Sequence, residues 1–91
     1  MIVSDDLGFN DVSFHGSTQI PTPHLDALAS GGLALYNYHV SPSCSPSRAT
    51  FMTGRHMIHH SVFGPFRGGG PEALDSAFTL LPQYLRRLNY R

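Results

Sequence analysis

This 91-residue sequence has few of the features that mark several common protein classes. It contains one cysteine, so no internal disulfide can form. No apolar run approaches the ~20 residues of a membrane-spanning helix, and no basic or long apolar leader follows Met1. We therefore predict neither a membrane span nor a signal peptide. Charged residues make up only 13% of the chain and balance to a formal net charge of zero. A nucleic acid or an anionic membrane surface is therefore not a predicted partner.

The sequence instead contains short apolar segments that alternate with helix signals. Segments 2–3 and 33–40 have the composition of β-strands. Between them, Thr22-Pro23 predicts a helix start, and the helix is predicted to stop at 31–32 (GG). A strand, a helix and a second strand in this order favour an α/β fold with a mostly parallel sheet.

The second half of the chain continues with two further predicted helices. Ser45 and Pro46 are predicted to be the cap and first residue of a helix that ends at Gly54. Residues 61–76 have loop composition, and Thr79 is predicted to cap a last helix with proline in its first turn. Ligands of parallel α/β sheets bind beyond the carboxyl ends of the strands, so the segments that follow the two strands are the candidate sites.

The first candidate site is the pair Asp5-Asp6. Adjacent carboxylates suit a hard cation, but within a strand they would point to opposite faces. Both can reach one ion only if the strand ends there and the backbone turns, which Leu7-Gly8 permits. The alternative is that both are solvated acids at the end of a strand.

The second candidate site is Cys44, which follows the second predicted strand and precedes a helix. The free N–H groups and the dipole at a helix start stabilise a tetrahedral oxyanion or a thiolate. Arg48, one turn later, can add a fixed positive charge. The alternative is a small, buried, apolar cysteine. In the predicted topology, Cys44 and the Asp5-Asp6 pair could share one crevice.

Several segments resemble type I sulfatases. Residues 44–48 (CSPSR) and 53–55 (TGR) resemble the C-x-P-S-R…T-G-R signature of that family. Residues 5–12 (DDLGFNDV) resemble its first metal-binding segment, and residues 22–29 (TPHLDALA) are similar to the group around arylsulfatase B. Residues 80–85 (LLPQYL) look like the helix before the family's next strand.

The resemblance implies a fold, a chemistry and a set of residue roles. It implies that residues 1–91 are the N-terminal, partial segment of a catalytic domain with an alkaline-phosphatase-like fold. It also implies one calcium ion, with Asp5, Asp6 and residue 44 as ligands. Cys44 would be oxidised to formylglycine by the formylglycine-generating enzyme and would act as the nucleophile, while Arg48 would stabilise its hydrate.

The same resemblance implies sulfate-ester substrates, either sulfated sugars of glycosaminoglycans or aryl sulfates, and a lysosomal or secretory location. Family members also use later calcium ligands, lysines and histidines, whereas this sequence contains no lysine. We therefore expect the 91 residues alone to be inactive. Two alternatives stay open: a truncated fragment that folds poorly or binds a partner, and a related phosphonate or phosphate ester hydrolase.

The histidines at 56, 59 and 60 suggest a further alternative. On a continued helix, His56 would share a face with both His59 and His60, which is possible zinc spacing. No acidic residue lies nearby to complete such a site, so we favour exposed or partner-facing histidines.

Overall fold

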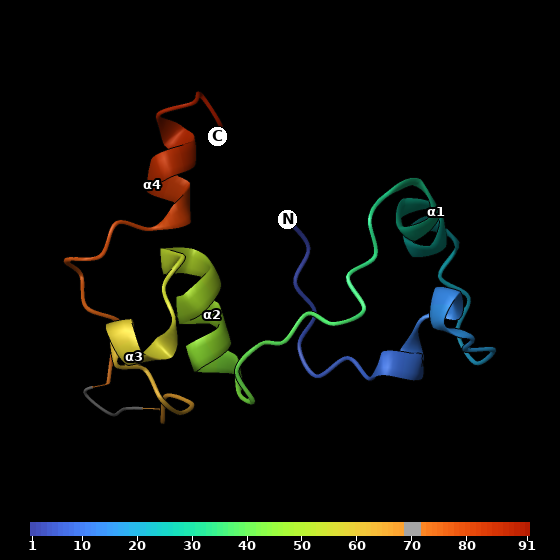
Figure 1. Ribbon diagram of the computed structural model, residues 1–91, viewed down its shortest axis with the longest axis horizontal. Coiled ribbons are helices and arrows are strands. Elements are labelled where there is room, and N and C mark those ends of the chain that lie inside the picture. The colour runs from blue at the N-terminus through green and yellow to red at the C-terminus, as the bar shows by residue number, and fades with distance from the viewer. Residues whose placement is uncertain (69–71) are drawn as a thin grey trace. The chain divides into compact units, whose positions relative to one another are not determined.

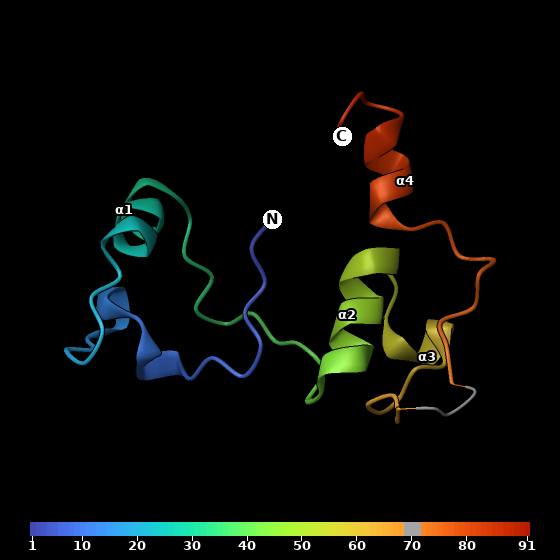
Figure 2. The same ribbon diagram turned by 180° about the vertical axis from the view of Figure 1, so that it is seen from behind.

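A computed structural model describes residues 1–68 and 72–91. The described chain forms two short 3₁₀ helices and four α-helices (Figures 1 and 2), in the order η1 (Phe9–Asp11), η2 (Ser13–His15), α1 (Pro23–Gly31), α2 (Cys44–Thr53), α3 (Met57–His60) and α4 (Leu81–Arg86). These elements belong to two compact units, residues 1–38 and 39–91, and each is described separately below. No helix within the described residues is long and apolar enough to cross a membrane.

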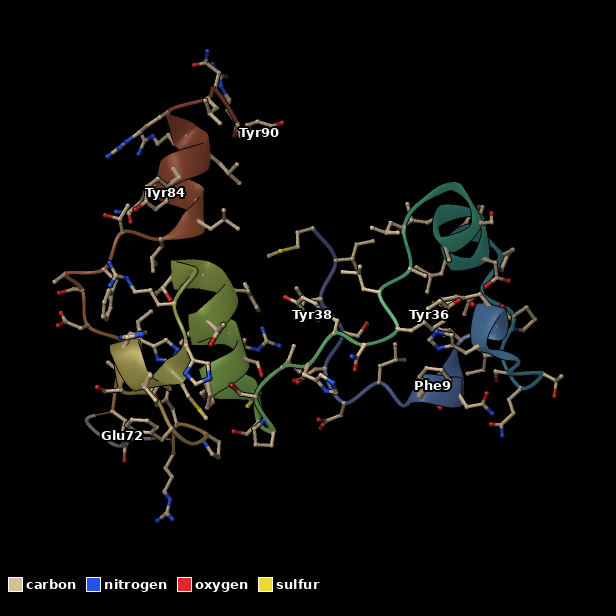
Figure 3. The ribbon with its side chains drawn as sticks, viewed as in Figure 1. Phe9, Tyr36, Tyr38, Glu72, Tyr84 and Tyr90 are labelled. Atoms are coloured by element: carbon tan, nitrogen blue, oxygen red, sulfur yellow. The ribbon has the colours of Figure 1, made fainter. Side chains whose placement is uncertain are left out.

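The two predicted strands are not formed: the described residues contain helices, turns and coil but no β-strand. Segments 2–3 and 33–40 are instead solvent-exposed coil, with Ile2 80% and Leu33 86% exposed. Tyr36 and Tyr38 lie on the second of these segments (Figure 3). A strand exists only when a neighbouring strand takes up its backbone hydrogen bonds, and no strand is formed within residues 1–68 and 72–91 to pair with either segment. The predicted parallel sheet is therefore not confirmed.

The first unit is organised around α1, which confirms the helix predicted from Thr22-Pro23. Proline occupies the first helical position and the helix ends at Gly31. The helix packs against η2, and Val12, between the two 3₁₀ helices, is buried with only 4% of its surface exposed. These contacts give the first unit a small core of its own.

The second unit is organised around α2, which packs against α3 and α4. Its buried residues include Pro46 and Ala49 on α2, together with His60 and Val62. The predicted left-handed glycine end of α2 is confirmed, since Gly54 has φ 68° and its N–H donates to Thr50 O.

The start of α2 was predicted two residues too late. Ser43, rather than Ser45, is the cap residue, and the helix begins at Cys44. Pro46 consequently lies at the third helical position, where the missing N–H costs nothing because the first four N–H groups of a helix have no intrahelical partner.

The last helix, α4, was predicted one residue too early at its start. Leu80 takes the cap position predicted for Thr79, and its N–H donates to the side chain of Gln83. Residues 61–68 and 72–76 of the predicted loop contain only coil, bends and turns. The predicted loop residues 69–71 lie outside the described residues.

Candidate functional site

The acidic pair lies on a turn of the first unit. Asp5 and Asp6 are both exposed, and the backbone bends at both residues. Asp6 has φ 53°, in the left-handed region that aspartate tolerates better than most residues. The chain therefore turns at Asp6 itself, one residue before the predicted Leu7-Gly8. This bend removes the objection that the two carboxylates must point to opposite faces of a strand.

A second turn follows the acidic pair directly. Gly8 N–H donates to Asp11 Oδ2 at 2.7 Å, and Asp11 N–H donates back to Gly8 O at 3.1 Å. A Cβ at position 8 would lie 2.9 Å from Asp11 Oδ2, which is closer than real contacts allow. A side chain at position 8 would therefore force the Asp11 carboxylate to shift from its present position. This G-x-x-D arrangement resembles one half of a helix capping box. The spacing is visible in the sequence and could have predicted the turn.

An aromatic contact supports the turn from the following 3₁₀ helix. The rings of Phe9 and His15 stack at a centroid separation of 3.9 Å with an interplanar angle of 8°. His15 Nδ1 also donates to the carbonyl oxygen of Phe9 at 2.6 Å, which places the proton on that nitrogen. Figure 3 labels Phe9 on η1.

A hydrogen-bonded cluster fixes α1 against η2. The hydroxyls of Ser13 and Thr22 each donate to the carboxylate of Asp26, with distances of 2.7 to 3.1 Å. Each hydroxyl also accepts the backbone N–H of the other residue, at 2.8 and 3.0 Å. Every polar group of this part-buried cluster is thereby paired, a role that sequence reasoning did not assign to Asp26.

Cys44 is the first residue of α2 in the second unit. Its thiol is exposed and free, and Sγ lies 3.9 Å from Ser45 Oγ. The alternative of a buried apolar cysteine is therefore wrong. Arg48 is also exposed and lies four residues later on the same helix, a spacing that places two side chains on one face. Cys44 at the electropositive start of α2 and the Arg48 guanidinium therefore lie on the same face of the helix.

The residues between Cys44 and Arg48 hold this segment in place. Ser45 Oγ accepts the N–H of Phe66 at 2.9 Å, and Ser47 Oγ donates to Ser41 O at 2.9 Å. Pro46 is completely buried. The segment therefore directs its structural side chains into the unit and leaves the cysteine accessible to solvent.

The Thr53-Gly54-Arg55 run ends the helix with three different contacts. Thr53 Oγ1 donates to Ala49 O at 2.7 Å and accepts the N–H of Arg55 at 3.2 Å. Gly54 provides the left-handed turn, and the Arg55 guanidinium lies 5.3 Å from the centroid of the Phe78 ring. This second half of the pattern is therefore structural within the second unit.

The acidic segment and the CSPSR and TGR segments occur together in a known protein family. The family model described as Sulfatase matches residues 1–91, the whole chain. The chain belongs to the sulfatase family. The resemblance inferred from the CSPSR and TGR segments is thereby confirmed.

Similar proteins include sulfatases from animals and bacteria. This sulfatase chain is 45% identical over 93 residues to arylsulfatase J of Mus musculus, covering 98% of the chain and 15% of that protein. It is 43% identical over 70 residues to human steryl-sulfatase, covering 76% and 12%, respectively. It is 33% identical over 90 residues to an N-acetylgalactosamine-6-O-sulfatase of Bacteroides thetaiotaomicron, covering 98% and 18%.

The chain thus spans less than a fifth of the length of each of these relatives. No solved structure matches it. Within the sulfatase chain, the acidic pair belongs to the first unit, whereas Cys44 and Arg48 belong to the second. The crevice that these residues are predicted to share stays a prediction.

The histidines of this sulfatase chain do not form the alternative zinc site. α2 ends before His56, which caps the separate helix α3 and accepts the Ile58 N–H through Nδ1. His60 is buried; its Nδ1 accepts the N–H of Val62, and its Nε2 contacts Thr50 Oγ1 at 3.2 Å. Among the described residues, no group of three or more histidine, cysteine or acidic side chains is placed to hold a metal ion.

Proposed function

We propose that this chain is the part of a sulfuric ester hydrolase that contributes the nucleophile and two metal-binding carboxylates. The observation that carries the proposal is the placement of Cys44. It is the exposed first residue of α2, whereas its neighbours in the sulfatase signature are buried or hydrogen-bonded. A side chain that must meet a substrate needs this combination of accessibility and a fixed backbone.

Calcium is the proposed metal, and the donors of the acidic turn fit it. Asp5 and Asp6 offer exposed carboxylate oxygens, the ligand type that calcium prefers. Two carboxylates do not supply the ~6–8 oxygens of a complete calcium shell. We propose that residue 44 adds a further ligand and that the full-length enzyme provides the remainder.

The proposed roles of the chain's residues follow from their positions. Cys44, once converted to formylglycine by the formylglycine-generating enzyme and hydrated, would supply the hydroxyl that attacks sulfur while the ester S–O bond breaks and the alcohol leaves. Calcium would supply Lewis-acid polarisation of the sulfate oxygens. Arg48 lies one helical turn further along α2, where its charge stabilises an anion at position 44. The N–H groups at the start of α2 favour a sulfate oxygen in the same way.

The substrate class is a sulfate ester, and we propose a sulfated sugar of a glycosaminoglycan or an aryl sulfate. The relatives' names include both an arylsulfatase and an N-acetylgalactosamine-6-O-sulfatase, which supports either choice. We also propose a lysosomal or secretory location, where the modifying enzyme would meet the chain. The parallel sheet of an alkaline-phosphatase-like fold would form once segments 2–3 and 33–40 gain neighbouring strands.

The deciding experiment is the mass of the peptide that contains Cys44, together with the intact mass, for protein from its native source. Formylglycine at position 44 would establish maturation, and a larger intact mass would identify the chain as part of a complete sulfatase. Unmodified cysteine on an intact 91-residue protein would overturn the catalytic role. We expect the purified 91-residue chain not to hydrolyse an aryl sulfate, and turnover by that chain would contradict the need for further residues.

A further inference from the structure

The turn from Gly8 to Asp11 begins two residues after the proposed calcium ligand Asp6. It has two hydrogen bonds, and the stronger one by length is the 2.7 Å bond from Gly8 N–H to the Asp11 carboxylate. A bond from an amide to an ionised carboxylate is stronger than one between neutral groups. The direction of the chain directly after the acidic pair is therefore set by a side chain outside that pair.

The residue between the two turns, Leu7, has 52% of its surface exposed. Leu7 lines an apolar cleft of about 730 Å³ in the first unit, together with Leu25 and Leu28 of α1. Only Leu7 separates the left-handed Asp6 from the hydrogen-bonded Gly8. If the Asp11 bond is lost, Gly8 is no longer held by it, and we expect Asp6, two residues earlier, to leave its left-handed conformation more readily.

We infer that Asp11 is a positioning residue for the proposed calcium ligands, holding the Asp5-Asp6 turn through Gly8 rather than binding the ion. This inference rests on the proposed function, because it assigns a role toward the calcium site proposed above. Asp11 is the third acidic residue of the DDLGFND segment, so its carboxylate is also a candidate ligand by sequence alone. The structure commits one oxygen of that carboxylate to Gly8 and places no three-ligand cluster among the described residues.

Two substitutions separate positioning from ligation. Asp11→Ala removes the acceptor, whereas Asp11→Asn removes the charge but keeps an oxygen that can accept the Gly8 N–H. A third variant, Gly8→Ala, leaves Asp11 intact but places a Cβ 2.9 Å from Oδ2. Gly8 has φ −71°, which alanine adopts without strain, so this variant tests the contact alone.

The measurement uses the ¹⁵N-labelled 91-residue chain in two NMR experiments. Without calcium, the backbone coupling constant of Asp6 reports its φ angle. With calcium chloride added stepwise, the amide shifts of Asp5 to Leu7 report the dissociation constant. We expect Asp11→Ala and Gly8→Ala to shift the Asp6 coupling and to weaken calcium binding about three- to ten-fold, the effect of losing one capping-type bond on the binding-competent population. We expect Asp11→Asn to stay within about two-fold of the parent chain.

A matched charge control comes from the second unit. Asp75 Oδ1 accepts the N–H of Ala77 at 2.9 Å, so Asp75→Ala removes the same charge and the same kind of bond elsewhere in the chain. We expect calcium affinity in this variant to equal that of the parent. Weaker calcium binding in Asp11→Asn with an unchanged Asp6 coupling would show that the charge itself matters and would overturn the positioning role. An unchanged Asp6 coupling in Asp11→Ala would overturn it as well.

The proposed calcium site is tested separately in the same titration. The double variant Asp5→Asn and Asp6→Asn keeps a residue that tolerates the left-handed conformation at position 6 but removes both carboxylates. Loss of calcium-dependent shifts in this variant supports the site. Unaltered shifts would overturn the calcium site, whereas the metal-free Asp6 coupling would still decide whether Asp11 holds the turn.

Discussion

The cysteine segment and the acidic segment of this chain are held by different kinds of interaction. The cysteine segment lies on α2, where Pro46 is completely buried and Ala49 is 6% exposed. Residues 1–11 are exposed throughout, and residues 8–11 are held by the Gly8–Asp11 bonds and the stack of Phe9 on His15. Packing therefore supports one candidate site, and local polar contacts support the other.

This difference predicts unequal tolerance to change. A helix face packed against two other helices moves only when its core is disrupted, whereas an exposed turn opens when one bond is lost. The proposed nucleophile therefore lies on a packed helix that resists change, whereas the proposed metal ligands lie on an exposed turn that changes more easily.

The largest effect is expected in the packed unit, at His60. His60→Ala removes a buried ring and leaves Thr50 and the Val62 N–H without these hydrogen bonds. We expect the free energy of unfolding to fall by about 2–4 kcal/mol, as measured by urea unfolding of the α2 and α3 amide signals. His59→Ala is the control, because it makes the same substitution at the preceding residue of α3, where the side chain is exposed. Equal losses in both variants would contradict the assignment of His60 to the core.

The next effect is expected in the first unit, at Asp26. Asp26→Ala leaves the hydroxyls of Ser13 and Thr22 without their shared acceptor. We expect a loss of about 1–3 kcal/mol for α1, measured by hydrogen exchange of its amides. His24→Ala, at an exposed position of the same helix, should change little. If Asp26→Ala left the hydrogen exchange of the α1 amides unchanged, α1 would not be held by this cluster.

Local signals in the sequence predicted α1, α2 and α4, whereas α3 and the two 3₁₀ helices were not predicted. Proline at the start of α1 and glycine at the end of α2 act within a few residues, so their effects are visible in the sequence. The exact start of α2 was not predictable, because Ser43 and Ser45 are both suitable caps. Tertiary contacts decide between them: Ser45 Oγ accepts the N–H of Phe66, 21 residues away.

The sheet was the part that sequence patterns could not establish. The composition of 33–40 indicates a preference for strand, but pairing depends on neighbours that lie far along a chain. The candidate site shows the same limit. The positions of Asp5, Asp6, Cys44 and Arg48 came from motifs, whereas the support from Asp11 became visible only through its bond to Gly8.

A smaller effect is expected from a pair of glycines, one in each unit. Gly54 ends α2 with φ 68°, so Gly54→Ala places a side chain in the left-handed region and should cost about 1–2 kcal/mol. Gly31 ends α1 without positive φ, and a Cβ added there would meet nothing within 4 Å, so Gly31→Ala should be neutral or stabilising by up to about 1 kcal/mol. Thermal unfolding of both variants measures the difference. A stabilising Gly54→Ala would remove the reason for a glycine in the TGR segment.

The smallest effect on stability is expected at the residue proposed to do the chemistry. Cys44→Ser changes an exposed atom, so the free energy of unfolding should shift by less than about 0.5 kcal/mol. Pro46→Ala, two residues later, removes buried ring atoms and should cost about 1–2 kcal/mol. Urea unfolding of the two variants would separate the residue proposed to face the substrate from the residue that holds the helix. If Cys44→Ser were as damaging as Pro46→Ala, the thiol would be part of the core, and its exposure could no longer support a role as nucleophile precursor.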